Sequence, residues 1–239
     1  MDDAVRRFRN GEARGAIFRD LILADAKLHM PGRELILLDI GCGRGIENNH
    51  ELQKSLAAIS AQYIGVEPDA NIPIGDWITL SYQCRFEDAP LEPNSIDIAF
   101  AFMVLEHLTE PQVFWNTLYA VLRPNGIFWG WTVDARHWFV LASLLTERLG
   151  FKNFYLNHLH GERGKDRYEN YSAHYQSNHP AQIKQLARQF RDVQIFSVSK
   201  VGQIDFYLPQ QVRWLAGILD EVAIRLRLPG ANLVVRAEK

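Results

Sequence analysis

The chain has 239 residues, of which 47% are hydrophobic, and its formal net charge is −2 with an isoelectric point near 6.4. This length and apolar content suffice for one large domain with a full core. The weak net charge disfavours a general nucleic-acid binder. The two cysteines, Cys42 and Cys84, match neither a zinc spacing nor a disulfide framework. Since no apolar leader or run of transmembrane length is present, we expect a cytoplasmic protein without stable membrane insertion.

Helical and extended patterns alternate along the first 133 residues. The predicted helices are 2–29, broken near Gly11 and Gly15, then 47–60 and 111–122. The predicted strands are 35–40, 63–66, a third within 78–86, then 96–102 and 127–132, the last after a turn at 124–126. Strands that alternate with helices are typical of a parallel sheet with right-handed crossovers.

The alternation is interrupted by residues 134–180. This segment predicts an apolar helix at 138–149 and then a polar stretch rich in Tyr, His and Arg. It is too long for an ordinary connection between a strand and a helix, so we interpret it as an insertion or lid over the sheet. Alternation resumes with the elements predicted at 181–190 (helix), 193–199 (strand), 210–227 (helix) and 232–236 (strand).

These elements predict an α/β fold, Rossmann-like and doubly wound. We expect a mostly parallel seven-stranded sheet with helices on both faces and a helical lid insertion after the fifth strand. The chain then divides into an N-terminal helical segment, a cofactor-binding core, the insertion and a C-terminal part of the sheet. Their ranges are 1–34, 35–133, 134–180 and 181–239.

A glycine-rich loop follows the first predicted strand. The strand ends at Asp39, and glycine then occupies every second position at Gly41, Gly43 and Gly45. Such a loop lets a ligand approach the backbone closely, as at the mouth of a nucleotide-binding parallel sheet. Ile46 stands where the dinucleotide fingerprint requires a small residue. A carboxylate at Asp39 would repel a pyrophosphate, whereas it suits a positively charged ligand.

Four segments in order resemble the class I S-adenosylmethionine-dependent methyltransferases, small-molecule branch. They are Leu38-Asp39-Ile40-Gly41-Cys42-Gly43-Arg44-Gly45, Gly65-Val66-Glu67-Pro68-Asp69, the run 95–108, and Leu122-Arg123-Pro124-Asn125-Gly126-Ile127. The resemblance spans roughly residues 35–132. One glycine motif alone is a weak signal, whereas four at the proper spacing are a strong one.

The resemblance implies S-adenosyl-L-methionine as cofactor, S-adenosyl-L-homocysteine as product, and a set of cofactor contacts. Asp39 would lie near the ammonium group of the cofactor, and Glu67 would accept hydrogen bonds from both ribose hydroxyls. Arg85 replaces the Asp that often contacts adenine, and an arginine cannot accept that bond. The implied cofactor-binding residues are Asp39, Gly41, Cys42, Gly43, Glu67, Pro68, Phe86, Glu87, Ala101 and Phe102.

Methyl transfer from a sulfonium is a direct displacement that requires an aligned nucleophile. His107 follows the fourth strand, where the methyl group would lie, and is our candidate general base. The alternative is that His107 packs against or caps the next helix. The tip at 101–104 lacks the Asn/Asp-Pro-Pro-aromatic motif of the amino-methyltransferases of DNA and of protein glutamine. We therefore expect a small-molecule acceptor, methylated at a hydroxyl oxygen, with nitrogen and carbon acceptors left open.

The insertion is expected to determine which acceptor binds. Tyr168, Tyr171, His174 and Tyr175 are the candidate substrate-binding residues, with ordinary aromatic packing as the alternative. The histidine spacing fits no metal motif, so we expect no metal. An apolar stripe on the helix predicted at 210–227 is interpreted as core, with a homodimer face or a membrane-surface contact as alternatives.

The sequence thus predicts a methyltransferase. Two alternatives remain open, a nicotinamide-dependent oxidoreductase and a cofactor-binding scaffold without turnover. The 26-residue gap from Gly41 to Glu67 and the residue at position 46 count against the oxidoreductase, whereas Arg85 and the untested base keep the scaffold open.

Overall fold

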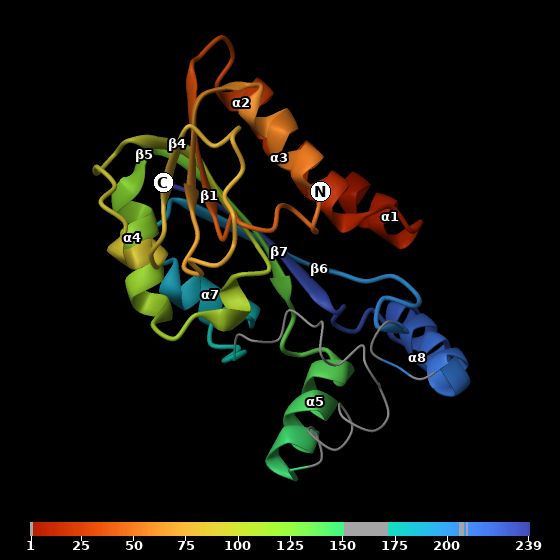
Figure 1. Ribbon diagram of the computed structural model, residues 1–239. Coiled ribbons are helices and arrows are strands. Elements are labelled where there is room, and N and C mark those ends of the chain that lie inside the picture. The colour runs from red at the N-terminus through yellow and green to blue at the C-terminus, as the bar shows by residue number, and fades with distance from the viewer. Residues whose placement is uncertain (1, 151–171, 206–207, 209) are drawn as a thin grey trace.

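A computed structural model of the chain describes residues 2–150, 172–205, 208 and 210–239. Its centre is one seven-stranded sheet with the order β3-β2-β1-β4-β5-β7-β6 (Figure 1). Strand β7 runs antiparallel to both of its neighbours, and the other described pairings are parallel. The predicted fold class, a Rossmann-like and mostly parallel sheet with helices, is confirmed.

The strands are β1 (Leu35–Ile40), β2 (Ser60–Val66), β3 (Leu80–Tyr82), β4 (Ile96–Phe102), β5 (Leu122–Val133), β6 (Asp192–Val198) and β7 (Asn232–Glu238). The α-helices are α1 (Asp2–Arg9), α2 (Arg14–His29), α3 (His50–Ala57), α4 (Pro111–Val121), α5 (Trp138–Arg148), α7 (Pro180–Leu186) and α8 (Arg213–Arg225). The described residues also form the short 3₁₀ helices η1 (Phe86–Asp88), η2 (Leu105–His107) and η5 (Gln210–Val212).

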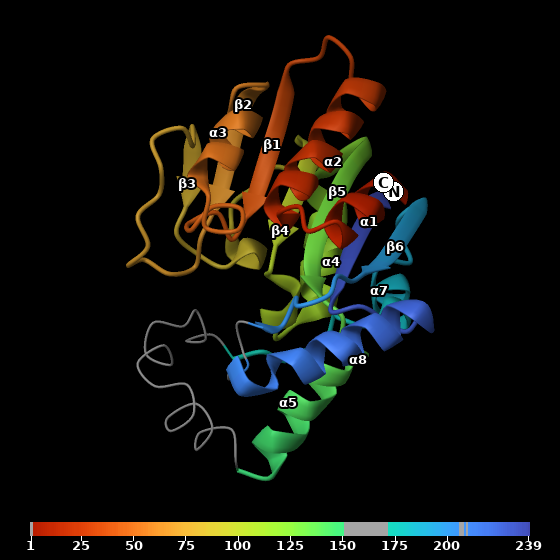
Figure 2. The same ribbon diagram turned by 90° about the vertical axis from the view of Figure 1, so that its right-hand side faces the viewer.

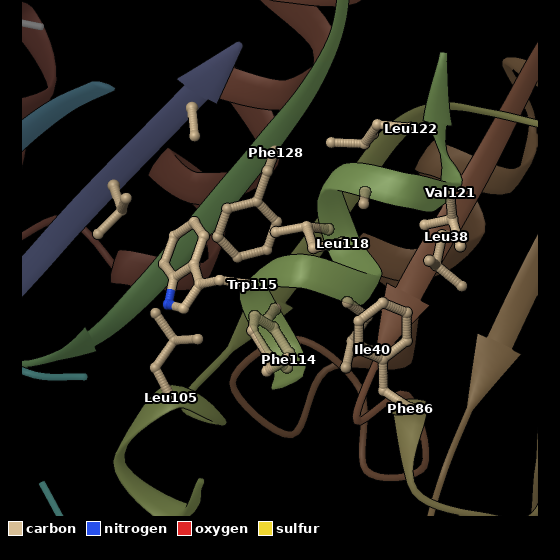
Figure 3. Close-up of a cluster of buried hydrophobic side chains, with 14 of the residues drawn as sticks. Leu38, Ile40, Phe86, Leu105, Phe114, Trp115, Leu118, Val121, Leu122 and Phe128 are labelled. Atoms are coloured by element: carbon tan, nitrogen blue, oxygen red, sulfur yellow. The ribbon is translucent and has the colours of Figure 1, made fainter. Parts of the chain in front are cut away.

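Helices cover both faces of the sheet, because successive strand side chains point to opposite sides. On one face, Leu38 and Ile40 of β1 share a buried cluster with α4 and α7. On the other face, Leu37 shares a second cluster with α1, α2 and α3. Figure 3 shows the first cluster, in which Phe114, Trp115 and Phe128 meet edge to face. These two cores fix β1 and β4 at the centre of the sheet.

Several element boundaries differ from those predicted. Gly11 does break the first helical segment, with φ of +92°, whereas Gly15 lies inside α2. The helix expected from residue 47 begins at His50, because Glu47 and Asn48 have positive φ and Ile46 bridges to Asn49. The third strand is only three residues long and is followed by η1. The turn at 124–126 lies within β5 as a register shift.

Helices α5 and α8 lie beyond the carboxyl ends of the central strands β1, β4 and β5 (Figure 2). The helix expected at 138–149 is thus present as α5, while its role as a lid stays a prediction. Residues 151–171 of the insertion lie outside the described residues. No helix in the described part of the chain is long and apolar enough to span a membrane.

The apolar stripe on α8 was expected in the core, and this expectation is wrong for the described residues. Trp214 is 66% exposed, and the rest of the stripe is also on the surface. The helix packs instead through the small residues Ala216 and Ala223 and through Asp220, whose carboxylate accepts the Gly202 N–H at 3.0 Å. The exposed members are Trp214, Leu215, Ile218, Leu219 and Val222.

The C-terminal end of α8 has an arginine at a position that favours glycine. Leu228 N–H donates to Ala223 O at 2.9 Å and Arg227 N–H to Ile224 O at 3.2 Å, the two bonds of a Schellman motif. Arg227, the left-handed residue of that motif, has φ of +54°. A side chain there costs about 1–2 kcal/mol. Part of this cost is offset, because glycine would lose more conformational entropy on folding than arginine does.

We therefore expect Arg227→Gly to raise the free energy of unfolding by about 1 kcal/mol. Arg225→Gly, inside the last turn of the same helix, should lower it by a similar amount. Urea denaturation followed by circular dichroism measures both changes. Equal destabilisation by the two glycines would contradict the left-handed assignment.

Candidate active site

The glycine loop is bound to the end of the neighbouring strand by its backbone. Gly41 N–H and Cys42 N–H both donate to Val66 O, at 2.8 and 3.2 Å. Gly41 has φ of +79°, and a Cβ at this position would lie 2.6 Å from the Val104 side chain. Glycine is required here because the loop turns sharply and packs directly against the segment after β4.

Glu67 follows β2 and joins this loop through its carboxylate. The residue is 6% exposed. One carboxylate oxygen accepts the Gly43 N–H at 3.1 Å, and the other accepts the Asp69 N–H at 3.0 Å. A Cβ at Gly43 would lie 2.8 Å from that first oxygen. The carboxylate is therefore held against the loop, and its remaining lone pairs are open to further donors.

Asp39 is a second buried carboxyl group, at the end of β1. Its Oδ2 accepts hydrogen bonds from Gln53 Nε2 at 2.7 Å and from the Tyr63 hydroxyl at 2.8 Å. Burial raises the pKa of Asp39 to about 7, although the bonds from Tyr63 and Gln53 act in the opposite direction and Glu67 raises it further. Gln53 Oε1, also buried, accepts no hydrogen bond within the described residues.

These groups fit a cationic nucleoside cofactor such as S-adenosylmethionine. The carboxyl groups of Asp39 and Glu67 lie near Gln53 Oε1, an acceptor without a donor. The described residues supply no ion pair to either carboxyl group. A sulfonium and an ammonium would supply the positive charge, and a ribose would supply hydroxyl donors. A pyrophosphate does not fit, because α3 begins only at His50 and its N-terminus is capped by Asn49.

The end of β4 contacts the start of the N-terminal helix α2. Ala101 is buried beside Ile40 of β1, and Phe102 lies partly exposed beneath the Arg14 guanidinium, 5.4 Å from its ring centre. Arg14 also donates to Glu47 at 2.8 Å. The start of α2 therefore covers the strand ends at which the resemblance places the methionine half of the cofactor.

His107 lies in η2, just beyond these strand ends, next to the returning end of the insertion. Its Nδ1 is 3.2 Å from Ser172 O. A carbonyl oxygen only accepts hydrogen bonds, so Nδ1 carries the proton, and in the neutral ring Nε2 is the basic nitrogen. His174 N–H and Tyr175 N–H donate to the backbone oxygen of Glu106 at 2.8 and 3.2 Å. Two of the four predicted substrate residues are thereby brought beside His107.

Tyr168 and Tyr171, the other two, lie outside the described residues. The ring of Phe86 packs on Phe114 in the core. Glu87 is paired with Arg85, 3.4 Å away, and Pro68 is exposed after Glu67. Burial raises the pKa of the Cys42 thiol, so this cysteine is a small, unreactive loop residue, as its surroundings in the sequence suggest.

Glu106 is a buried residue of the site whose contacts sequence reasoning did not identify. Burial raises the pKa of its carboxyl group, against the opposing effects of His107 and Arg14. Thr132 of β5 donates to its Oε2 at 2.8 Å, and Asn178 donates to Thr132 Oγ1 at 2.7 Å. This network fastens the segment 172–178 to the ends of β4 and β5. The available signal was the pair Glu106-His107 standing between the apolar residues Leu105 and Leu108.

Gln53 and Tyr63 were also missed, since neither belongs to a glycine or strand-end motif. The potential metal ligands give no further site: the described residues contain no group of three or more His, Cys, Asp or Glu arranged to hold a metal. The absence of a metal stays a prediction.

The sheet order and the glycine-loop site are those that the resemblance to class I methyltransferases predicts. Residues 38–130 match the family model described as a methyltransferase domain. This match covers less than half of the chain, and it supports an S-adenosylmethionine-dependent methyltransferase of class I.

The sequences of curated relatives match this chain over part of their length. The chain is 33% identical over 122 residues to a ubiquinone biosynthesis O-methyltransferase of Bradyrhizobium diazoefficiens, covering 47% of this chain and 46% of the relative. It is 30% identical over 138 residues to the mitochondrial ubiquinone biosynthesis O-methyltransferase of Mus musculus, covering 52% and 36%. The chain thus spans about half the length, or less, of the curated relatives it matches.

Solved structures support the fold. A methyltransferase dependent on S-adenosylmethionine from Archaeoglobus fulgidus has a TM-score of 0.55 and 16% identity, with 98% of this chain and 97% of that chain covered. Phosphoethanolamine N-methyltransferase 2 of Haemonchus contortus, in complex with phosphomonomethylethanolamine and S-adenosylhomocysteine, also has a TM-score of 0.55. Its identity is 15%, with 92% of this chain and 52% of that chain covered.

The raised pKa of Asp39 predicts a pH-dependent cofactor affinity. Only the ionised carboxylate attracts a cation, and with a pKa of about 7 it is mostly protonated at pH 6 and mostly ionised at pH 8. We expect S-adenosylhomocysteine, through its ammonium group, to bind about tenfold more weakly at pH 6 than at pH 8. Calorimetric titration measures this ratio.

Two variants separate Asp39 from other titrating groups. Asp39→Asn keeps the oxygen that accepts from Gln53 and Tyr63 and should give weak, pH-independent binding. Tyr63→Phe removes a bond that lowers the pKa of Asp39 and should move the transition to higher pH. A flat profile in the unmodified protein would contradict the role of Asp39.

Proposed function

We propose that this protein transfers a methyl group from S-adenosylmethionine to a hydroxyl oxygen of a small-molecule acceptor. The observation that carries the proposal is the pair of buried carboxyl groups, Asp39 and Glu67, on either side of the glycine loop. The O-methyltransferases among the curated relatives support an oxygen acceptor. The strand tip at 101–104 adds support, because it lacks the motif that holds a planar amino group.

Each residue would have a distinct role. Asp39 would attract the cofactor's ammonium, Glu67 would accept from its ribose hydroxyls, and the backbone of Ala101 and Phe102 would contact its methionine half. The bound cofactor supplies an electrophilic methyl group on a positively charged sulfur. The site residues would hold the acceptor hydroxyl in line with it.

His107 would act as the general base in this reaction. Its Nε2 would take the hydroxyl proton as the oxygen–carbon bond forms, and the electron pair of the broken sulfur–carbon bond would stay on sulfur. The bond from Nδ1 to Ser172 O would keep the ring in the tautomer that this step requires. His174 and Tyr175, together with Tyr168 and Tyr171, would contact the acceptor.

Thermal unfolding with different ligands tests the cofactor. S-adenosylhomocysteine should raise the melting temperature, because a ligand that binds only the folded state stabilises it, whereas NAD should leave it unchanged. The opposite pattern would favour a nicotinamide-dependent oxidoreductase. Transfer of label from methyl-labelled S-adenosylmethionine to phenolic acceptors then distinguishes an enzyme from a cofactor-binding scaffold.

The remaining properties are part of the same proposal. We infer a cytoplasmic protein that acts without nucleic acid, without a metal and without stable membrane insertion. A homodimer through the exposed stripe of α8 is compatible with this function, and sedimentation velocity would detect it.

A further inference from the structure

Three arginines line an open cavity of about 420 Å³ that is distinct from the glycine-loop site. Arg9 is the last residue of α1, Arg136 follows β5, and Arg227 follows α8. Two hydroxyl groups and an apolar wall complete the cavity. These other lining residues are Ser197, Ser199, Ile224, Leu228 and Pro229.

Arg136 is held in place by a buried carboxylate. Its Nε donates to Asp134 Oδ1 at 2.9 Å, and its Nη2 donates to Asp134 Oδ2 at 2.7 Å. Asp134 is fully buried and also accepts from Ser197 Oγ at 2.8 Å. The orientation of this guanidinium is therefore fixed, and Asp134 offsets one of the three positive charges in the cavity.

The other two arginines keep their charges uncompensated. Neither Arg9 nor Arg227 forms an ion pair within the described part of the chain. Arg227 in addition occupies the left-handed position of the Schellman motif at the end of α8. Folding alone would favour glycine at that position, so the arginine side chain is retained at a cost in stability.

We propose that this cavity binds a phosphate group of a phosphate ester. Guanidinium groups match the oxygens of a phosphate in a bidentate way, and several of them from different elements can surround one dianion. Ser199 and the Arg9, Arg136 and Arg227 side chains would face the phosphate. The apolar wall of Ile224, Leu228 and Pro229 would contact the esterified group. The site is independent of the methyl transfer proposed above.

Titration with inorganic phosphate tests the site in the full-length protein. Phosphate should raise the melting temperature more than chloride does at equal ionic strength, and the increase should saturate with phosphate concentration. Arg227→Gly preserves the backbone conformation and should weaken phosphate binding at least tenfold, and so should Arg9→Gln. Arg225→Gln is the matched control, because it removes the same charge two residues earlier, at the end of α8 and outside the cavity. Its phosphate affinity should be unchanged.

Vesicles distinguish the source of the phosphate. A lipid headgroup would be supported if phosphatidylglycerol vesicles retain the protein and phosphatidylcholine vesicles do not. This retention should depend on Arg9 and Arg227. Phosphate binding without vesicle retention would support a soluble phosphate ester. The proposal would be overturned if phosphate and chloride raised the melting temperature equally and phosphatidylglycerol vesicles did not retain the protein. It would also be overturned if Arg227→Gly and Arg225→Gln lost phosphate affinity equally.

Discussion

The His107→Ala variant should lose about a hundred- to ten-thousand-fold in kcat while its affinity for S-adenosylhomocysteine stays unchanged. This range is the usual contribution of a positioned general base. The Nδ1 bond to Ser172 O leaves Nε2 as the basic nitrogen, so the variant removes the proton acceptor without touching the glycine loop. Single-turnover methyl transfer, followed over a range of pH, measures the loss.

The control for this experiment is His29→Ala. His29 is the last residue of α2 and is not part of η2 or of the proposed site. It should keep full activity. Added imidazole should partly restore the His107→Ala variant if the lost group is a base. Unchanged kcat together with a lower melting temperature would instead assign His107 to packing of the turn before α4.

The Glu67→Ala variant should bind S-adenosylhomocysteine at least about a hundredfold more weakly. Hydrogen bonds to a charged group contribute about 1.5–3 kcal/mol each, and the carboxylate would accept two from the ribose. Its removal also leaves the Gly43 and Asp69 N–H groups without their acceptor, which loosens the loop itself. Calorimetric titration gives the affinity directly.

Glu67→Gln is the conservative partner in this series. It keeps the size and one oxygen acceptor, so we expect a smaller loss of about tenfold. Glu92→Gln, an exposed acid before β4, should change nothing. If Glu67→Ala bound the cofactor normally, the ribose role would be lost, and Glu67 would be a structural brace of the glycine loop.

The central sheet was predictable because buried parallel strands give continuous apolar runs. Residues 35–40 and 96–102 match β1 and β4 in both bounds. The short β3 was harder to predict, since its three residues, two half-buried and one exposed, carry little pattern. The start of α3 was misplaced because the left-handed residues Glu47 and Asn48 do not interrupt a helical pattern of apolar side chains.

The cofactor loop could be predicted from local spacing, whereas the polar network around it could not. Asp39, Gly41 and Glu67 stand in motifs that are read from neighbouring residues. Thr132 and Asn178 act on Glu106 across long sequence separations, and only the folded sheet brings them together. The outward face of α8 was misassigned because helical periodicity identifies an apolar side without saying what covers it.

The place of β7 in the sheet has a consequence for synthesis on the ribosome. Among the described strands, β6 pairs only with β7, which also pairs with β5. Residues 192–198 therefore emerge before the strand that joins them to the sheet, and a nascent chain that ends short of Asn232 exposes two open strand edges. Such edges invite association with other chains, so vectorial folding of this protein is completed late and benefits from chaperones that shield unpaired strands.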